Sequence, residues 1–182
     1  MKPAVVLRQL LHYKRVLLLY RAKPDGVELC KPEAFYLFVG YADIPLPWRG
    51  VVLPRGLANV MLCRLLAGRA MLVCYSEDGQ TLLGYGWIQK WAAFRRRFGL
   101  FARDAWMLGP FWTAPAARGH GIYRSLLCWC RSYLRGEKDL FIYTSPDNIP
   151  SQRGIASAGF EPVGAWEMTV WLRLVVRWTR ID

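Results

Sequence analysis

The sequence predicts a mixed α/β sheet flanked by helices, formed as one domain by residues 1–182. Two observations favour this class: two apolar runs flank a tight-turn signal, and a strand, a helix and a second strand follow one another later in the chain. The length is sufficient for one core without disulfides or metals. A composition of 54% hydrophobic and 21% charged residues is typical of folded chains and excludes a disordered one.

The N-terminal third predicts one strand and one helix. Residues 15–21 contain an apolar run of strand length, from Val16 to Tyr20, and we expect them to form the first strand. The stretch 24–54 contains five prolines, so it is predicted to be irregular or briefly helical, and an enzyme would place a substrate-shaping loop there. Residues 57–66 carry apolar side chains at helical spacing, with Gly68 as the expected C-cap.

The middle of the chain predicts a hairpin and a further strand. Residues 70–75 and 81–91 are apolar and aromatic, and Asp78-Gly79 between them is a strong turn signal for an antiparallel pair. The basic cluster 95–97 is interpreted as a solvated loop, with contact to a phosphate-bearing ligand as the alternative. Residues 104–113 are expected to form the next strand, ended by proline.

The C-terminal part predicts two helices and three strands. Residues 119–135 have an apolar stripe at helical spacing, and 139–144 form a short buried strand. Asp147 or Asn148 is expected to cap a short helix that has proline in its first turn and ends at a glycine. Two closing strands follow, and they are predicted at 161–164 and 168–176.

Charge and cysteine content restrict the function classes. Lys and Arg number 25 against 13 Asp and Glu, a formal charge of +12, so the surface should attract phosphates, nucleic acid, anionic lipid or an acidic substrate. The five cysteines lie in apolar segments and are expected to be buried free thiols, and the two histidines are not at metal-ligand spacing, so no metal is expected.

No secretory signal or membrane-spanning run is recognised, because basic residues interrupt the apolar N-terminus and the longest uncharged run has 13 residues. We therefore expect a cytoplasmic protein. The basic and aromatic segment 171–178 fits contact with a membrane surface or with a second subunit, as in a homodimer.

The segment from Gly109 to Arg124 carries the chemistry. A strand leads into a proline-bearing turn and a loop that contains Gly119 and Gly121, and a helix begins inside that loop. The first N–H groups of a helix have no internal partner, and glycine lets an anion approach them closely. The helix dipole adds roughly 0.3 to 1 kcal/mol per favourable charge. The loop is therefore predicted to hold a phosphate.

This segment resembles the GNAT superfamily of acetyl-CoA-dependent N-acetyltransferases, whose motif is Gln/Arg-x-x-Gly-x-Gly/Ala. Arg118 occupies the first position and Gly121 the fourth, while Tyr123 replaces the usual small residue at the sixth. A second motif agrees in order and spacing, since Asn148-Ile-Pro-Ser151 is followed by Gly159-Phe160. The close resemblance covers residues 104–164. It implies a mostly antiparallel twisted sheet splayed between its fourth and fifth strands.

The resemblance also implies where acetyl-CoA lies. Its pantetheine arm would pass through the splay, and its pyrophosphate would lie at the helix start. Acetyl would pass directly to an amine by proximity, with a base or water taking the proton and a backbone N–H polarising the thioester. The residues expected to bind the coenzyme are Phe111, Trp112, Thr113, Arg118, Gly119, His120, Gly121, Tyr123, Arg124, Asn148 and Ser151.

The proton-transfer groups are harder to assign. Many relatives have a tyrosine seven residues after the asparagine, where this chain has Ile155. Tyr143 and Tyr123 are the substitute candidates for the general acid, with packing as the alternative role. The family's strand carboxylate would fall near residues 108–109, which are not acidic. More remote candidates for the base are Asp104, Glu167 and Asp43, and His120 is expected to face phosphate or solvent.

Three function hypotheses result. The first is an acyl-CoA-dependent N-acyltransferase, with acetyl as the favoured group and a small-molecule primary amine, anionic or sugar-linked in a glycan or nucleotide sugar, as acceptor. The second is an inactive module that keeps the coenzyme site, suggested by Ile155 and by the missing carboxylate. The third, nucleic-acid binding through residues 95–97 and the basic C-terminus, is ranked last because no recognition motif accompanies the dispersed charge.

Overall fold

The computed structural model describes residues 12–22, 35–38, 43, 64, 68–100, 104–134, 138–171 and 174–182. Within these ranges the strands are β1 (His12–Ala22), β2 (Phe35–Phe38), β3 (Ala70–Tyr75), β4 (Leu82–Lys90), β5 (Ala105–Thr113), β6 (Asp139–Thr144), β7 (Glu161–Trp171) and β8 (Leu174–Arg180). The helices are η3 (Trp91–Ala93), α4 (Arg95–Phe98), η4 (Pro115–Ala117), α5 (Ile122–Tyr133) and α6 (Ile149–Ser157).

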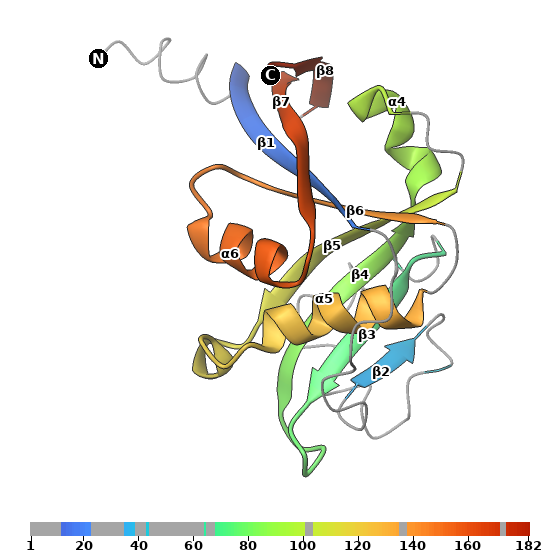
Figure 1. The fold of residues 1–182 in the computed structure, drawn as a ribbon, viewed down its shortest axis with the longest axis vertical. Helices are drawn as coiled ribbons and strands as arrows, with labels where there is room; N and C mark the ends of the chain where they lie inside the picture. The colour runs from blue at the N-terminus through green and yellow to red at the C-terminus, as the bar shows by residue number, and fades with distance from the viewer. Residues whose placement is uncertain are drawn as a thin grey trace.

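All of these strands belong to one sheet, in the order β2-β3-β4-β5-β6-β1-β7-β8. Neighbouring strands run antiparallel except for β5 and β6, which are parallel. A parallel pair needs a crossover connection, and α5 supplies it. The mixed, mostly antiparallel sheet with flanking helices confirms the predicted fold class (Figure 1).

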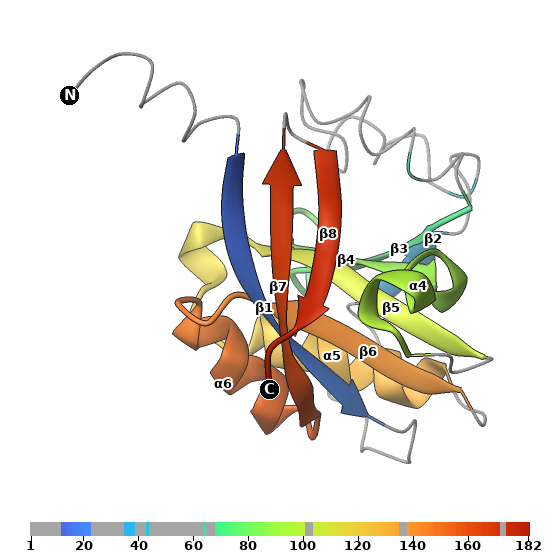
Figure 2. The same ribbon diagram turned by 90° about the horizontal axis from the view of Figure 1, so that it is seen from above.

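The N-terminal strand lies in the interior of the sheet. β1 pairs with β6 along Leu18–Ala22 and with β7 along nearly its whole length, so it separates two strands that follow each other in the chain (Figure 2). The sequence predicts a strand at 15–21, and the structure extends it to 12–22. The residues that it pairs with are at least 118 positions away along the chain, a relation that local periodicity does not encode.

The two faces of the sheet carry different helices. On one face α5 and α6 pack with the even-numbered residues of β6, Leu140 and Ile142, in a core that also includes Leu126 and Ile155. On the other face α4 and η3 pack against Phe141 in an aromatic cluster. We call these the α5 face and the α4 face. They differ in composition, and each builds a different half of the site.

Some predicted elements are corrected by the structure. Residues 35–38, expected to be irregular, form β2 and pair with β3. The cluster 95–97, expected as a loop, lies in the single turn of α4, although its side chains are exposed. The two closing strands are divided differently, because β7 continues unbroken from 161 to 171 and β8 covers 174–180. At Val163, next to Gly164, β7 has one extra residue relative to β1, so the chain bulges there and does not turn.

The expected helix at 57–66 lies outside the described residues apart from Arg64, but its predicted end is visible. Gly68 has a φ of 70°, and the N–H of Arg69 donates to the carbonyl of Arg64 at 3.2 Å. This is the hydrogen bond expected of a glycine C-cap. The Asp78-Gly79 turn is also confirmed, with Gly79 at a φ of 68° between β3 and β4.

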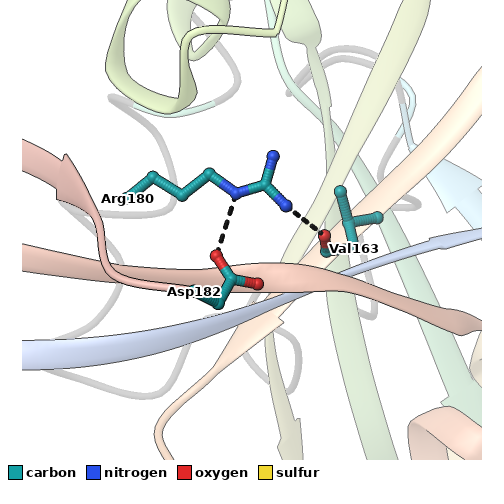
Figure 3. Close-up of polar contacts among 3 residues, drawn as sticks. All are labelled: Val163, Arg180 and Asp182. Atoms are coloured by element: carbon teal, nitrogen blue, oxygen red, sulfur yellow. Dashed lines mark hydrogen bonds and ion pairs between the residues drawn. The ribbon is translucent and has the colours of Figure 1, made fainter.

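Polar contacts made by Arg180 near the C-terminus hold β8 against β7 (Figure 3). Arg180 donates from Nε to Asp182 Oδ1 at 2.9 Å and from Nη2 to the carbonyl of Val163 at 3.2 Å. Its guanidinium also lies 5.3 Å from the ring centre of Trp166. The end of the chain is therefore fixed to the beginning of β7.

None of the helices within the described residues is long and apolar enough to cross a membrane. Of the cysteines, Cys74, Cys128 and Cys130 are described, and all three are buried free thiols. Burial raises the pKa of the Cys74 thiol to about 11, so it stays protonated and unreactive near neutral pH.

Candidate active site

The site begins where β5 separates from β6. Their pairing runs only from Ala105 and Asp139 to Leu108 and Ile142, although β5 continues to Thr113. The separation follows a bulge, because the β4–β5 register shifts across Gly109-Pro110. The splay therefore lies between the fourth and fifth strands in sheet order, as predicted, and the last residues of β5 are left without pairing to β6.

Beyond the splay, β5 leads through η4 into the predicted phosphate loop. Gly119 and Gly121 adopt φ angles of 82° and 79°, the left-handed region that favours glycine. No heavy atom lies within 4 Å of a Cβ built on either residue, so this backbone borders open space. A bulky anion can therefore approach the loop.

The first turn of α5 has unpaired amides that face this loop. Gly121 is the N-cap, no side chain caps the helix, and the first helical hydrogen bond runs from Ser125 N–H to Gly121 O at 2.9 Å. No described backbone carbonyl accepts from the N–H groups between Gly119 and Arg124. Unpaired amides at a helix start, beside glycines in an open loop, form an anion-binding site. This geometry fits a pyrophosphate.

Basic side chains border the loop, but some of their nitrogens already form hydrogen bonds with backbone carbonyls of the protein. Arg118 donates from Nε to the carbonyl of Thr113 at 3.4 Å, and His120 Nδ1 lies 3.1 Å from the carbonyl oxygen of Arg118. Arg124 points elsewhere, since its Nε donates to the carbonyl of Ser157 at the end of α6. A direct contact from Arg124 to a phosphate would have to use its remaining N–H groups.

Tyr123 links the two helices behind the loop. Its hydroxyl shares a hydrogen bond of 3.1 Å with the Ser151 hydroxyl, and its ring lies edge-on to Phe111 with centres 5.4 Å apart. Each ring lies against a glycine: a Cβ at Gly154 would meet Tyr123 at 2.6 Å, and one at Gly86 would meet Phe111 at 2.0 Å. The structure therefore joins β5, α5 and α6 through two aromatic rings.

The second motif caps α6 as the sequence predicts. Asn148 is the N-cap, and its Oδ1 accepts from the N–H of Ser151 at 3.3 Å. The structure thus brings Phe111, Tyr123, Asn148 and Ser151 together on the α5 face. Of the two caps that the sequence left open, Asn148 is the one used.

The two tyrosines proposed as general acids lie on opposite faces. Burial raises the pKa of Tyr123 to about 12, the largest effect on this group, while its bond to Ser151 lowers it in part. Tyr143 alternates with Ile142 along β6 and therefore faces the α4 side, where its ring packs 6.0 Å from Phe98 and 40% of its surface is exposed. The structure does not bring these two residues together.

The remaining candidates are separated from the splay or already paired. Ile155, at the position of the family's usual tyrosine, is a fully buried core residue. Asp104 pairs with Lys138 at 3.5 Å and Glu167 with Lys14 at 2.8 Å. Among the described residues no group of three or more potential metal ligands is found.

Sequence reasoning missed the polar group nearest the bulge. Gln89 is 7% exposed, and its side-chain amide donates to the carbonyl of Gly109, so it fixes the bulge from the α4 face. Trp112, expected to bind the coenzyme from its strand or to stack on a sugar or a base, stacks on Tyr85 on the same face, with ring centres 5.5 Å apart. A glutamine within an apolar strand at 82–90 was the available signal.

Comparison with known families agrees with this geometry. The sequence model of the acetyltransferase (GNAT) family matches residues 42–160, which is more than half of the chain. The chain belongs to the GNAT family. The matched range includes the splay, the loop and the start of α6. Members of this family use acetyl-CoA, and the open loop with unpaired amides fits its pyrophosphate.

Solved structures of the GNAT family share the fold at low identity. An acetyltransferase from Colwellia psychrerythraea is 16% identical, with a TM-score of 0.53 over 94% of this chain and 57% of its own. One from Novosphingobium aromaticivorans is 17% identical, with a TM-score of 0.58 over 87% and 64%. A tandem GNAT protein from the clavulanic acid pathway is 19% identical, with a TM-score of 0.56 over 94% and 58%. This GNAT chain spans about three fifths of the length of these proteins.

No protein with a curated function matches the sequence. The family is therefore established by its sequence model, and the fold by the structural neighbours. The acceptor has to be inferred from the residues of the site.

Proposed function

We propose that this GNAT protein is an acyl-CoA-dependent N-acetyltransferase that passes acetyl from acetyl-CoA directly to a primary amine. The observation that carries the proposal is the set of unpaired amides between Gly119 and Arg124 at the start of α5, beside an open loop. These donors suit the pyrophosphate of the coenzyme. The splay lies directly before them along the chain.

Each part of the site has a task in this reaction. The free side of Phe111 to Thr113 offers backbone groups to the pantetheine arm, and Asn148 and Ser151 border the arm at the start of α6. Holding the thioester beside the amine converts a bimolecular reaction into an effectively unimolecular one. A backbone N–H beyond the bulge polarises the thioester carbonyl, whose developing negative charge it stabilises.

Tyr123 and Tyr143 differ in how well each could donate a proton to the departing thiolate. Tyr123 is held by Ser151, and its pKa of about 12 makes it a weak acid, so its expected role is to close the wall of the coenzyme channel. Tyr143 lies on β6 beyond the end of β5 pairing and is partly exposed. We propose Tyr143 as the stronger candidate of the two.

The proposed acceptor is a small amine, anionic or linked to a sugar, as in an amino sugar of a glycan or a nucleotide sugar. The net charge of +12 exceeds what one coenzyme needs and favours an acceptor that carries phosphate or another acid. An acyl-CoA-binding regulatory module is the second candidate. It is favoured by Ile155 in the core and by the lack of Asp or Glu on β4 and β5.

Thiol release from acetyl-CoA across a panel of amines tests the proposal, with coenzyme affinity measured in parallel by calorimetry. We expect release that depends on one class of amine. Micromolar binding of acetyl-CoA without turnover on any amine would instead support the regulatory module. Absence of binding would contradict both candidates.

A further inference from the structure

The outward side of α4 consists of arginines alone. Phe94 and Phe98 lie four positions apart and are both buried in the aromatic cluster, so they point inward. Between them come Arg95, Arg96 and Arg97, which are all exposed. Successive residues of a helix are about 100° apart, so these three side chains diverge over the outward half of the turn. A small ligand needs polar groups that converge in a hollow, so diverging arginines fit an extended anionic surface instead.

The neighbouring strands continue this basic surface. Phe98 packs on the ring of Trp178 in β8, with ring centres 4.9 Å apart. Trp178, Met168 and Arg15 lie directly opposite one another in β8, β7 and β1, so their side chains share the α4 face. At the usual strand spacing the backbone of Arg15 lies about 10 Å from that of Trp178. Figure 1 places α4, β8 and the start of β1 at the same end of the molecule, and in Figure 2 α4 lies beside β8.

Arginines of this surface lie over aromatic rings. The guanidinium carbon of Arg15 is 5.8 Å from the ring centre of Tyr13, and that of Arg97 is 5.5 Å from the ring centre of Phe94. Ring faces covered in this way are not available for stacking by nucleic-acid bases. Basic residues beside amphipathic aromatic rings, such as the partly exposed Tyr13, are typical of proteins that lie in the headgroup layer of a bilayer.

The charge of this surface is not balanced by carboxylates. Lys14 and Arg15 are adjacent in β1 and therefore point to opposite faces of the sheet. Lys14 pairs with Glu167 at 2.8 Å, whereas no carboxylate of the described residues pairs with Arg15 or with the three arginines of α4. Arg180, the neighbouring basic residue of β8, is paired with Asp182. The same strand thus has its charge neutralised on one face and unpaired on the α4 face.

We propose that this surface, formed by Arg95, Arg96 and Arg97 of α4 and by Arg15 of β1, docks the protein on an anionic lipid bilayer. The arginines bind the headgroup phosphates, and the net charge of +12 attracts the protein to the membrane from a distance. Each basic residue close to such a surface strengthens binding about fivefold. This contact is separate from acetyl transfer and does not depend on that activity.

Co-sedimentation with lipid vesicles tests the proposal on the full chain, without coenzyme or acceptor. The probes are vesicles of phosphatidylcholine alone and vesicles in which about one third of the lipid is phosphatidylglycerol. We expect binding to the second kind only, weakened steeply when salt rises from about 0.05 M to about 0.5 M, because salt screens exposed charges. Equal binding to both kinds of vesicle, or binding to neither, would overturn the proposal.

Substitutions in α4 test whether charge is responsible. The triple variant Arg95→Gln, Arg96→Gln, Arg97→Gln should bind anionic vesicles about a hundredfold more weakly, at about fivefold for each arginine. The matched triple lysine variant keeps the charge and should keep most of the affinity. Both variants should retain the wild-type urea unfolding curve, because the substituted side chains are exposed. An equal loss in the lysine variant would show that charge is not what binds, contrary to the proposal.

Lys14 and Arg15 provide a second matched pair, because glutamine at either position removes one charge from the same strand. Arg15→Gln should weaken vesicle binding about fivefold. Lys14→Gln should change it little, since Lys14 points to the other face and is paired with Glu167. Equal losses in the two variants would show that the vesicles respond to net charge and not to the α4 face, and the proposal would then be wrong.

A nucleic acid is the other extended anionic partner that a basic surface can bind. Fluorescence anisotropy with a labelled RNA strand and a labelled DNA duplex measures this binding at the same salt concentrations. We expect vesicle binding under conditions in which neither oligonucleotide binds. Oligonucleotide binding that requires the three arginines of α4, together with no vesicle binding, would assign the surface to nucleic acid and overturn the proposal. None of these outcomes bears on acetyl transfer, which is measured separately.

Discussion

The two faces of the splay position their ligands in different ways. On the α5 face the coenzyme loop relies on backbone: glycines at positive φ, unpaired amides, and two rings seated on Gly86 and Gly154. On the α4 face the donors and surfaces are side chains, chiefly Gln89, Tyr85 and Trp112. The first arrangement depends on chain geometry, and the second on residue identity.

This difference explains why a sequence motif identifies one half of the site and not the other. Backbone amides are available from any residue, so the constraint falls on the positions where a Cβ would block the anion or strain the turn, such as Gly119 and Gly121. An acceptor surface made of side chains can change while the fold is kept. The comparison predicts that coenzyme affinity and acceptor KM respond to separate sets of substitutions.

The largest effect is expected from Gly86→Ala. The Cβ of the new alanine would lie 2.0 Å from the Phe111 ring, so this ring must move away from β4 and lose its contact with the Tyr123 ring. Overpacking of this kind costs about 1–3 kcal/mol of unfolding free energy. Urea denaturation should show this loss, and calorimetry should show weaker acetyl-CoA binding.

The matched control is the double variant Gly86→Ala, Phe111→Ala, in which no ring opposes the new methyl group. We expect the overpacking part of the loss to disappear, so that the two substitutions are strongly non-additive. Additive losses would show that Phe111 does not lie on Gly86.

A smaller effect is expected from Gly154→Ala. The new Cβ would meet Tyr123 at 2.6 Å and push its hydroxyl from Ser151, but alanine in a helix gains about 0.8–1 kcal/mol over glycine. Stability should therefore change little, while acetyl-CoA binds more weakly. An unchanged Kd for acetyl-CoA in calorimetry would show that Tyr123 and Ser151 do not contribute to the coenzyme-binding site.

The smallest effect is expected from Tyr123→Phe, and it depends on pH. The folded pKa of about 12 lies above the ordinary value of 10, so burial favours the protonated phenol. The stability linked to this phenol is fully present below pH 10 and is lost as pH rises toward 12. Tyr123→Phe has no phenol at this position, so it lacks this pH-dependent loss of stability. Its unfolding free energy should fall less between pH 9 and pH 11 than that of the wild type, measured by urea denaturation.

Much of the fold could be predicted from local signals. The hairpin around Asp78-Gly79, the strand 139–144 and the Asn148 cap depend on residues a few positions apart, and the structure confirms each of them. The helix predicted at 119–135 begins at Ile122, because Gly119 and Gly121 occupy left-handed conformations that a helix excludes.

Other features depend on contacts between distant segments. The place of β1 between β6 and β7 follows from pairing across most of the chain. Gln89 was not predicted as part of the site because its importance arises from the Gly109 carbonyl, twenty residues away on the next strand. The predicted coenzyme residues around Tyr123 are brought together in space, whereas Arg124 is turned toward α6.

The most direct test of the account is a calorimetric titration of acetyl-CoA into Gly121→Glu and Gly121→Lys. Both variants put a long side chain on the same left-handed residue and carry the same backbone strain, so only the charge facing the loop differs. We predict that the glutamate variant loses acetyl-CoA binding while the lysine variant keeps it within about tenfold of the wild type. Equal affinities for the two variants would contradict a pyrophosphate site at the start of α5.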